Sequence, residues 1–211
     1  MGCVCTKKRR IFEDPSLLSS QTIFTVKEIK ALNELFRKLG STFVDDGFIN
    51  REEFKLGLFR NSNHHSLLAD RMFDMFDSKN DGVIDFGEFV RSLSVFHPDT
   101  PQQDKAIFAF KLYDTRGNGY IEKDEVKEMI IELLNESNLI LPDNIIEAII
   151  DKTFEEADTE NDGRIDIEEW QAFADRRPSL LRNMTIPYLK DLPATFPSFA
   201  TIPERFDEIT T

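Results

Sequence analysis

One short pattern recurs four times along the chain and restricts what it can fold into. The pattern is Gly-x-Ile-x-x-x-Glu followed by an apolar residue. Its glycines are Gly47, Gly82, Gly119 and Gly163, and its glutamates are Glu53, Glu88, Glu125 and Glu169. The glutamates lie 35 to 44 residues apart, which is the length of one helix–loop–helix unit. The repeat therefore predicts four consecutive units of this kind.

The segments between the copies have the spacing of amphipathic helices. Thr25 and Glu28 are placed to form a capping box at the start of the first helix. Thr100 is expected to cap the helix before the third copy, with Pro101 at its first position. An apolar stripe leads into the fourth copy and consists of Ile145, Ile146, Ile149, Ile150 and Phe154. Few runs alternate as a strand would, so the predicted fold is all-α.

The isoleucine of each copy is placed to pair neighbouring loops through a short β contact. Copies one and two, and copies three and four, are therefore predicted to form two lobes. We expect an N-terminal segment at 1–25, the first pair at 26–97, the second pair at 98–176 and a C-terminal tail at 177–211. Five of the nine prolines lie between residues 178 and 203, so that tail is not expected to form a long helix.

Each copy lies at the spacing of a calcium-binding loop. Such a loop needs oxygen ligands at positions 1, 3, 5, 7, 9 and 12, and glycine at position 6. The fourth copy fits with Asp158, Glu160, Asp162, the carbonyl of Arg164, Asp166 through water, and Glu169. Converging carboxylates repel one another unless a divalent cation lies between them. The predicted ligand is Ca²⁺.

The second and third copies fit less well, because a cation stands at position 3. Lys79 and Arg116 can only donate hydrogen bonds there, so weaker binding is expected. The remaining ligands of the second loop are Asp77, Asp81, the carbonyl of Val83, Asp85 and Glu88. Those of the third are Asp114, Asn118, the carbonyl of Tyr120, Glu122 and Glu125. Whether the third loop is empty at rest stays open at this point.

The first copy is irregular in its first half. Thr42 and Val44 fall at positions 1 and 3, where neither is a good side-chain ligand. Its second half is intact, with Asp46, the carbonyl of Phe48, Asn50 and Glu53. Either backbone carbonyls near residues 40–41 replace the missing ligands, or the loop only supports its neighbour. Ligand charge ranks the fourth loop strongest, the second next, and the first and third weaker.

The N-terminus has the sequence of a lipidated membrane anchor. Residues 1–6 match the pattern for myristoylation of Gly2, and Cys3 beside it is a predicted palmitoylation site. Cys5 is a candidate for a second one. Four cations follow at residues 7–10 and would favour an anionic membrane surface. The alternative is an unmodified tail.

Composition excludes several other classes. The net charge of −13 repels nucleic-acid phosphates, so no nucleic-acid partner is expected. The only cysteines are the two at the N-terminus, which rules out a disulfide framework. The histidines are His64, His65 and His97, and no catalytic motif accompanies them, so the chain is not expected to be an enzyme. The 19 phenylalanines are interpreted mainly as core, with some lining a groove for a partner helix.

Taken together, these residues resemble those of the plant calcineurin B-like calcium sensors of the EF-hand superfamily. The resemblance rests on the start at residues 1–3, the irregular first loop, the segments at 73–77 and 85–93, and Phe-Pro-Ser-Phe at 196–199. It implies a sensor that binds and activates serine/threonine kinases through an amphipathic regulatory helix held in an apolar groove. It also implies phosphorylation at Ser198 and a place on the cytoplasmic face of the plasma membrane, with a cytoplasmic pool in addition. The alternatives are the regulatory B subunit of a calcineurin-type phosphatase and a calcium buffer.

Overall fold

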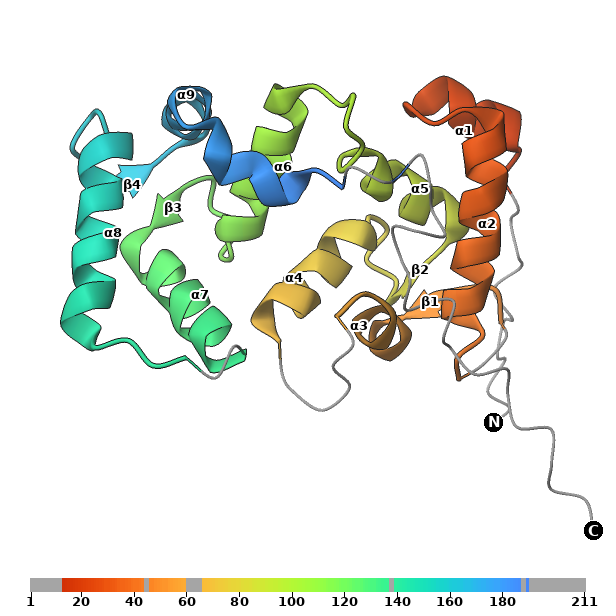
Figure 1. The fold of residues 1–211 in the computed structure, drawn as a ribbon, viewed down its shortest axis with the longest axis horizontal. Coiled ribbons are helices and arrows are strands. Elements are labelled where there is room, and N and C mark those ends of the chain that lie inside the picture. Colours follow the sequence, from red (N-terminus) through yellow and green to blue (C-terminus); the bar gives the residue numbers. More distant parts are fainter. Residues whose placement is uncertain (1–12, 44–45, 60–65, 137–138, 187–188, 190–211) are drawn as a thin grey trace, which may run out of the picture.

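The computed structural model describes residues 13–43, 46–59, 66–136, 139–186 and 189, and the predicted all-α fold is confirmed (Figure 1). The first half contains α1 (Pro15–Gln21), α2 (Val26–Gly40), β1 (Ile49–Asn50), α3 (Arg51–Phe59), α4 (Leu67–Phe76), β2 (Val83–Ile84) and α5 (Phe86–Ser94). The second half contains α6 (Gln102–Tyr113), β3 (Ile121–Glu122), α7 (Lys123–Glu136), α8 (Asp143–Ala157), β4 (Arg164–Ile165), α9 (Ile167–Arg176) and the 3-10 helix η1 (Pro178–Met184). No helix in this described part is both long and apolar enough to cross a membrane.

The loops pair as the repeated isoleucine predicts. Strand β1 pairs antiparallel with β2, and Ile49 lies opposite Ile84. Strand β3 pairs in the same way with β4, and Ile121 lies opposite Ile165. All four isoleucines are buried. Each pair of loops is therefore held together by two-residue strands over an apolar contact.

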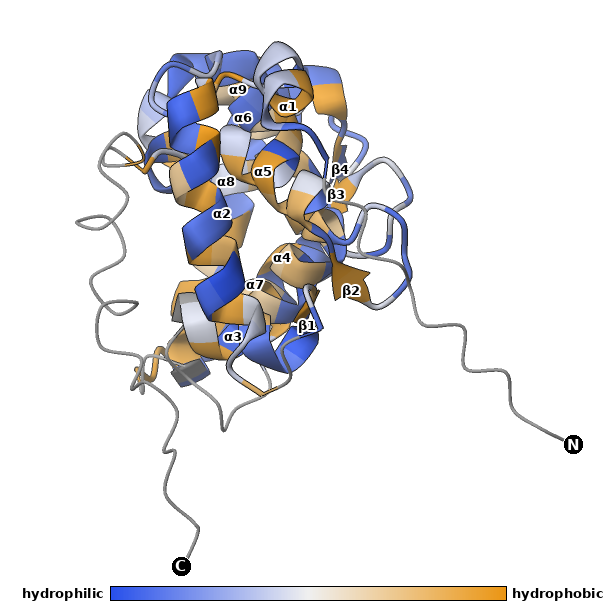
Figure 2. Cartoon of the chain, turned by 90° about the vertical axis from the view of Figure 1, so that its right-hand side faces the viewer, coloured by the Kyte–Doolittle hydropathy of each residue, from blue (hydrophilic) through white to orange (hydrophobic). Residues whose placement is uncertain are grey.

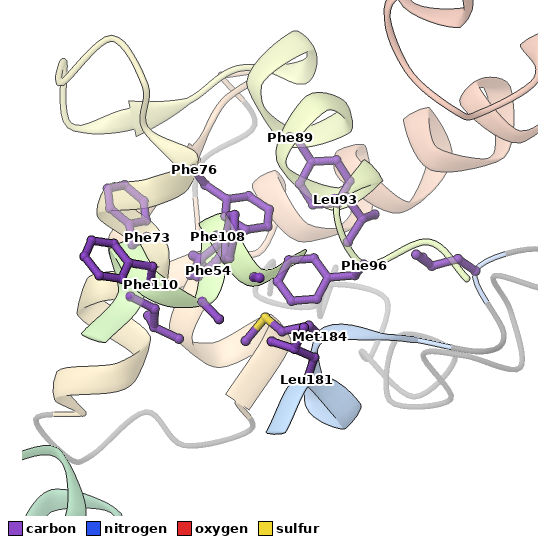
Figure 3. Packing of buried hydrophobic residues seen from close by; sticks show 14 of the residues in the cluster. Phe54, Phe73, Phe76, Phe89, Leu93, Phe96, Phe108, Phe110, Leu181 and Met184 are labelled. Atoms are coloured by element: carbon purple, nitrogen blue, oxygen red, sulfur yellow. The ribbon is translucent and has the colours of Figure 1, made fainter. Parts of the chain in front are cut away.

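A row of phenylalanine rings fills the core of the first pair, and α2, α3, α4 and α5 each contribute one ring to it. Ring centroids are 5.5 Å apart between Phe36 of α2 and Phe89 of α5, and 6.4 Å apart between Phe89 and Phe76 of α4. Phe76 lies 5.1 Å from Phe54 of α3. Phe108 of α6 belongs to the same buried cluster as Phe76 and Phe89, so the core continues toward the second pair (Figure 3). Most of the described phenylalanines are core, as expected.

Helix caps agree with the sequence in part. The capping box of Thr25 and Glu28 is present at α2. The prediction that Thr100 caps α6 and that Pro101 is its first residue is wrong. Helix α6 begins at Gln102, Pro101 is the residue before it, and no side chain caps this end of the helix. The Thr100 hydroxyl instead donates to the carbonyl of Ser94 at 2.6 Å, where it closes the turn after α5.

The stripe predicted before the fourth loop is narrower than expected. Ile146, Ile150 and Phe154 of α8 are buried, but Ile145 and Ile149 are 43% and 45% exposed. The reason is that α8 packs mainly against α7 and α9, which cover only one side of it. Two isoleucines of the stripe therefore face solvent.

Helix α1 lies within the predicted N-terminal segment at 1–25. Asp14 caps it by accepting from the amide of Ser16, and Leu18 is completely buried. The Arg91 guanidinium of α5 contacts residues at both ends of α1, pairing with Glu13 and donating to Gln21 at 3.0 Å. Helix α1 is therefore fastened to the first pair across α2 and α5.

Candidate calcium-binding loops

The aspartate at position 1 ends the entering helix in the last three loops. Asp77, Asp114 and Asp158 are the C-cap residues of α4, α6 and α8. The carboxylate of each accepts hydrogen bonds from the amides at positions 5 and 6, at 2.8–3.2 Å. These bonds fold the first half of the loop around the carboxylate.

The glycine at position 6 makes the sharp turn. In all four loops its φ lies between +82° and +85°, a conformation that side-chain-bearing residues rarely adopt. The turn directs the rest of the loop back toward the exiting helix.

The glutamate at position 12 is buried in every loop, with exposed fractions of 1–8%. In the last three loops one carboxylate oxygen accepts from the amide at position 9, at 2.9–3.1 Å. The other oxygen accepts from the amide at position 3, at 2.8–3.0 Å. Each glutamate therefore ties the beginning of its loop to the end.

A hydroxyl at position 2 completes this arrangement and was missed by the sequence analysis. Ser78, Thr115 and Thr159 each donate to the position-12 glutamate at 3.0–3.1 Å. The signal was present, since position 2 is serine or threonine in the last three loops. These donors fix the orientation of the glutamate carboxylate within the loop.

The fourth loop shows this effect on a titratable group. Burial alone would raise the pKa of Glu169, but the hydrogen bonds that it accepts from the loop outweigh burial. The pKa of Glu169 therefore lies below its ordinary value, and the carboxylate is charged at neutral pH.

Position 3 distinguishes the loops most clearly. In the second loop the Lys79 ammonium pairs with Asp85 at position 9 and lies 3.8 Å from Glu88 Oε2. In the third loop the Arg116 guanidinium pairs with Glu122, also at position 9. Both cations reach across the loop to carboxylates that the sequence assigns as ligands, while their own side chains stay 52% and 44% exposed. We interpret each one as an internal counter-ion that calcium must displace.

The charge on Lys79 is stabilised where it lies. Burial lowers the pKa of the Lys79 ammonium, but the hydrogen bond and charge of Asp85, with the charges of Glu88 and Glu13, outweigh it. The pKa of Lys79 is raised as a result. The pairing with Asp85 therefore favours the charged form of the lysine at the place where a metal ligand is expected.

The fourth loop carries no such counter-ion. Glu160 stands at position 3, and within the described residues no lysine or arginine pairs with Asp158, Asp166 or Glu169. Arg164 lies 3.8 Å from Asp162 and stacks over the Tyr120 ring of the third loop at 4.8 Å. Its side chain leaves the loop interior, and its carbonyl stays the predicted ligand.

In the first loop the glutamate at position 12 also joins the two ends of the loop. Glu53 accepts from the amides of Phe43 and Asn50, both at 3.1 Å. The Phe48 carbonyl approaches Gly40 so closely that a Cβ there would lie 2.2 Å from the oxygen. Asp46 accepts from the Phe48 amide at 3.0 Å. Val44 lies outside the described residues, so both interpretations of this loop stand.

One contact to the third loop comes from the other lobe. Arg71 of α4 donates to the carbonyls of Lys111 and Asp114, both at 2.7 Å. Asp114 is position 1 of the third loop, so Arg71 joins α4 of the first pair to this loop. Sequence analysis missed it because the two residues are 43 positions apart.

The donor set of the loops fits calcium. Carboxylate and carbonyl oxygens are the ligands that this hard cation prefers. The described candidates lie on the loops, in their short strands, or in the first turn of the exiting helix. In this structure the carboxylates accept from the loops' own amides, and no three His, Cys, Asp or Glu side chains of the described residues are gathered closely enough to hold an ion. Bound calcium would supply the positive charge that draws positions 1 and 12 of a loop together. The fold and these loops define an EF-hand calcium-binding protein.

Comparisons with known proteins agree with this class. The EF-hand domain pair matches residues 103–175, and the EF hand domain matches residues 68–96. Calcineurin B-like protein 5 of Arabidopsis thaliana is 54% identical over 94% of this chain and 99% of its own length. The calcineurin B subunit of Naegleria gruberi is 36% identical over 75% of this chain and 85% of its own, and that of Schizosaccharomyces pombe is 35% identical over 77% and 87%.

The chain belongs to the calcineurin B-like calcium sensors, as the sequence motifs indicated. It binds calcium through its EF-hands. The individual ligands and the segment boundaries stay predictions. Gly2, Cys3 and Ser198 lie outside the described residues.

Replacing Glu169 by Gln is expected to remove the tightest phase of a calcium titration. Glutamine keeps the shape of the side chain but loses the charge that a bidentate ligand supplies. The affinities of the filled loops should lie at roughly 10⁻⁷ to 10⁻⁵ M, the range of calcium sensors. Isothermal titration calorimetry would measure this, with the exposed neighbour Glu168→Gln as the control. If the tightest phase survives and Glu88→Gln removes it, the ranking of the loops is wrong.

Replacing Lys79 by Asn is expected to tighten the second loop by about tenfold, because a cation is removed and an oxygen ligand is added at position 3. The measurement is a calcium titration in the Glu169→Gln background, where the fourth loop does not mask the second. Lys111→Asn removes an exposed lysine outside the loops and serves as the control. Equal affinities with and without Lys79 would show that the lysine does not compete.

Proposed function

We propose that this calcium sensor is anchored to a membrane and binds and activates serine/threonine protein kinases by holding an amphipathic regulatory helix. The chain acts through binding rather than catalysis. The observation that carries the proposal is the way in which the C-terminal segment is seated on the apolar core. That surface is of the kind that an amphipathic helix uses.

The C-terminal seat consists of Leu181, Met184 and Leu189 packed onto the core, where all three are buried. Figure 3 shows Leu181 and Met184 close to Phe96. The Phe96 ring packs against Phe108 of α6 with centroids 5.2 Å apart. The seated segment thus covers apolar side chains from both halves of the chain.

Few polar contacts among the described residues hold the segment in the seat. The Ile186 amide donates to the carbonyl of Phe96 at 2.8 Å, and the Lys105 ammonium donates to the Thr185 hydroxyl at 2.8 Å. Lys105 is 5% exposed, and burial lowers the pKa of its ammonium, with only the charge of Asp99 acting in the opposite sense. Burying a charge that has only one hydrogen bond among the described residues is unfavourable. The C-terminal segment is therefore closely packed in its seat, but its polar contacts stabilise it little.

A kinase helix could replace this segment because both offer apolar side chains and the helix satisfies its own backbone. Further apolar surface is exposed on α7, on α8 and between them, at Ile131, Leu133, Leu139, Ile140, Leu141, Ile145 and Ile149. Calcium bound in the loops would change the angles between helices and favour the exchange. Phosphorylation of Ser198 would add about −1.5 to −2 charges to the tail and shift its preferred partners. The alternative is that the seated segment is a static brace.

The exchange is tested by the affinity for a kinase regulatory peptide. Thr185→Val leaves the Lys105 ammonium without its hydroxyl partner and weakens the seat, so peptide binding should tighten by about fivefold or more, the equivalent of about 1 kcal/mol. Thr153→Val removes a hydroxyl that bonds only within α8 and is the matched control. A chain truncated after Arg177 should bind more tightly still. If both Thr185→Val and the truncated chain bind the peptide with unchanged or lower affinity, the exchange is wrong and the segment is a static brace.

We further propose that Gly2 and Cys3 carry the lipids that hold the protein at the cytoplasmic face of the plasma membrane, beside a cytoplasmic pool. One myristoyl chain binds only weakly, with an association constant on the order of 10⁴ M⁻¹, and a second chain makes the attachment stable. Gly2→Ala should release the protein, because palmitoylation of Cys3 follows membrane contact, and Cys3→Ser should leave a weak, exchanging population. Cell fractionation measures this. A Gly2→Ala protein that stays in the membrane pellet would contradict it.

Two other functions are separated by the same measurements. A phosphatase regulatory protein of the calcineurin B type would bind a phosphatase catalytic chain instead of the kinase peptide; the lower identity to the calcineurin B relatives makes this the second candidate. A calcium buffer would bind calcium without any change in peptide affinity.

A further inference from the structure

The outer side of α2 carries cations that have no ion-pair partner among the described residues. Lys27, Lys30, Arg37 and Lys38 are all exposed, and none pairs with a carboxylate in that part of the chain. The other described cations of the first pair behave differently. Arg51, Lys55, Lys79 and Arg91 pair with carboxylates, and Arg71 donates to carbonyls.

The four cations share one face because of the helical period. At 3.6 residues per turn they fall within about 100° of arc and extend along about 16 Å of the helix. The opposite side of α2 is the core stripe of Ile29, Leu32, Leu35, Phe36 and Leu39. Figure 2 looks onto α2 from outside and shows hydrophilic residues along its visible side.

Acidic side chains only partly cancel this charge. Glu34 lies within the same arc and is the only exposed carboxylate among residues 26–40. Glu28 is half-buried and accepts from the Thr25 amide and hydroxyl in the capping box, both at 2.8 Å. On a chain of net charge −13, a face of four cations and one carboxylate is a local reversal of sign.

Apolar side chains are exposed at the N-terminal end of the same face. Val26 begins α2 and is 37% exposed, Ile23 precedes it at 38%, and Leu17 of α1 is 48% exposed. Cations beside apolar side chains match an anionic lipid surface, where the charges meet headgroups and the apolar groups enter the interface. An acidic protein surface could pair with the cations but would not account for the exposed apolar side chains of Leu17, Ile23 and Val26.

We propose that this α2 face, made of Lys27, Lys30, Arg37, Lys38, Ile23, Val26 and Leu17, lies against an anionic membrane and orients the sensor there. The four cations of residues 7–10 occur a short way before it in the sequence and add charge of the same sign. The proposal deepens the proposed membrane function and rests on it for its biological setting. The lipid-binding test below uses chains without acyl groups, so it can fail while anchoring by Gly2 succeeds, and the reverse.

The test is sedimentation of the unacylated full chain with vesicles of phosphatidylcholine containing about 30% phosphatidylserine, an anionic surface of cytoplasmic type. The triple variant Lys27→Gln, Lys30→Gln, Arg37→Gln should bind at least about tenfold more weakly. The matched control Lys111→Gln, Lys152→Gln, Arg182→Gln removes the same charges from exposed positions in the second half that pair with no described carboxylate. The control should bind as the wild type does. Wild-type binding should weaken between about 0.1 and 0.5 M salt.

A second measurement reports orientation even if the vesicle affinities are small. An environment-sensitive fluorophore on Ala31→Cys, exposed one turn after Lys27, should shift its emission with these vesicles but not with phosphatidylcholine alone. The same label on Glu155→Cys of α8 should not respond; both carry Cys3→Ser and Cys5→Ser. Equal vesicle binding by the α2 triple variant and the control triple variant would overturn the proposal. An emission shift only for the label at position 155 would overturn it as well. Loss of kinase-peptide binding by the α2 triple variant with unchanged vesicle binding would assign the face to a protein partner and overturn it as well.

Discussion

The hydrogen bonds of the position-12 glutamate are the interaction on which the other features of each loop depend. In the last three loops this buried carboxylate accepts from the amides of positions 3 and 9, so it joins the end of the entering helix to the start of the exiting one. Because the carboxylate is held from both sides, it is already placed before an ion arrives. The paired isoleucines then connect the two loops of each pair.

The last three loops share these hydrogen bonds but differ in the residue at position 3 and in its ion pairing. Lys79 and Arg116 pair with the position-9 carboxylates in the second and third loops, whereas Glu160 stands at the same position of the fourth loop, where the described residues supply no counter-ion. On our interpretation of these ion pairs, calcium would have to displace a cation in the two central loops but not in the fourth. Arg71 adds a further constraint, since it ties the third loop to α4 in the other pair. A sensor built in this way would fill its loops in a graded order rather than all at once.

The proposed binding surfaces occupy different parts of the fold. Helix α2 lies at one end of the molecule, and the C-terminal seat involves α6 and α9 (Figure 1). Attachment of α2 to a membrane would thus leave the seat available to a partner. Helix α1 strengthens this arrangement because Arg91 and Leu18 fasten it across α2 and α5.

The sequence by itself determined the four loops, their pairing and the helical fold, because each depends on residues close together in the chain. The calcium ligands, the turn glycine of each loop and the capping box of Thr25 and Glu28 all lie within a dozen residues of one another. Only the tertiary structure decided which way Lys79 and Arg116 point, that Arg71 reaches Asp114, that Thr100 closes a turn instead of capping α6, and that the α2 cations have no ion-pair partner among the described residues. The pairing of a long side chain depends on which distant groups the fold brings within reach, and spacing along the chain does not contain that information.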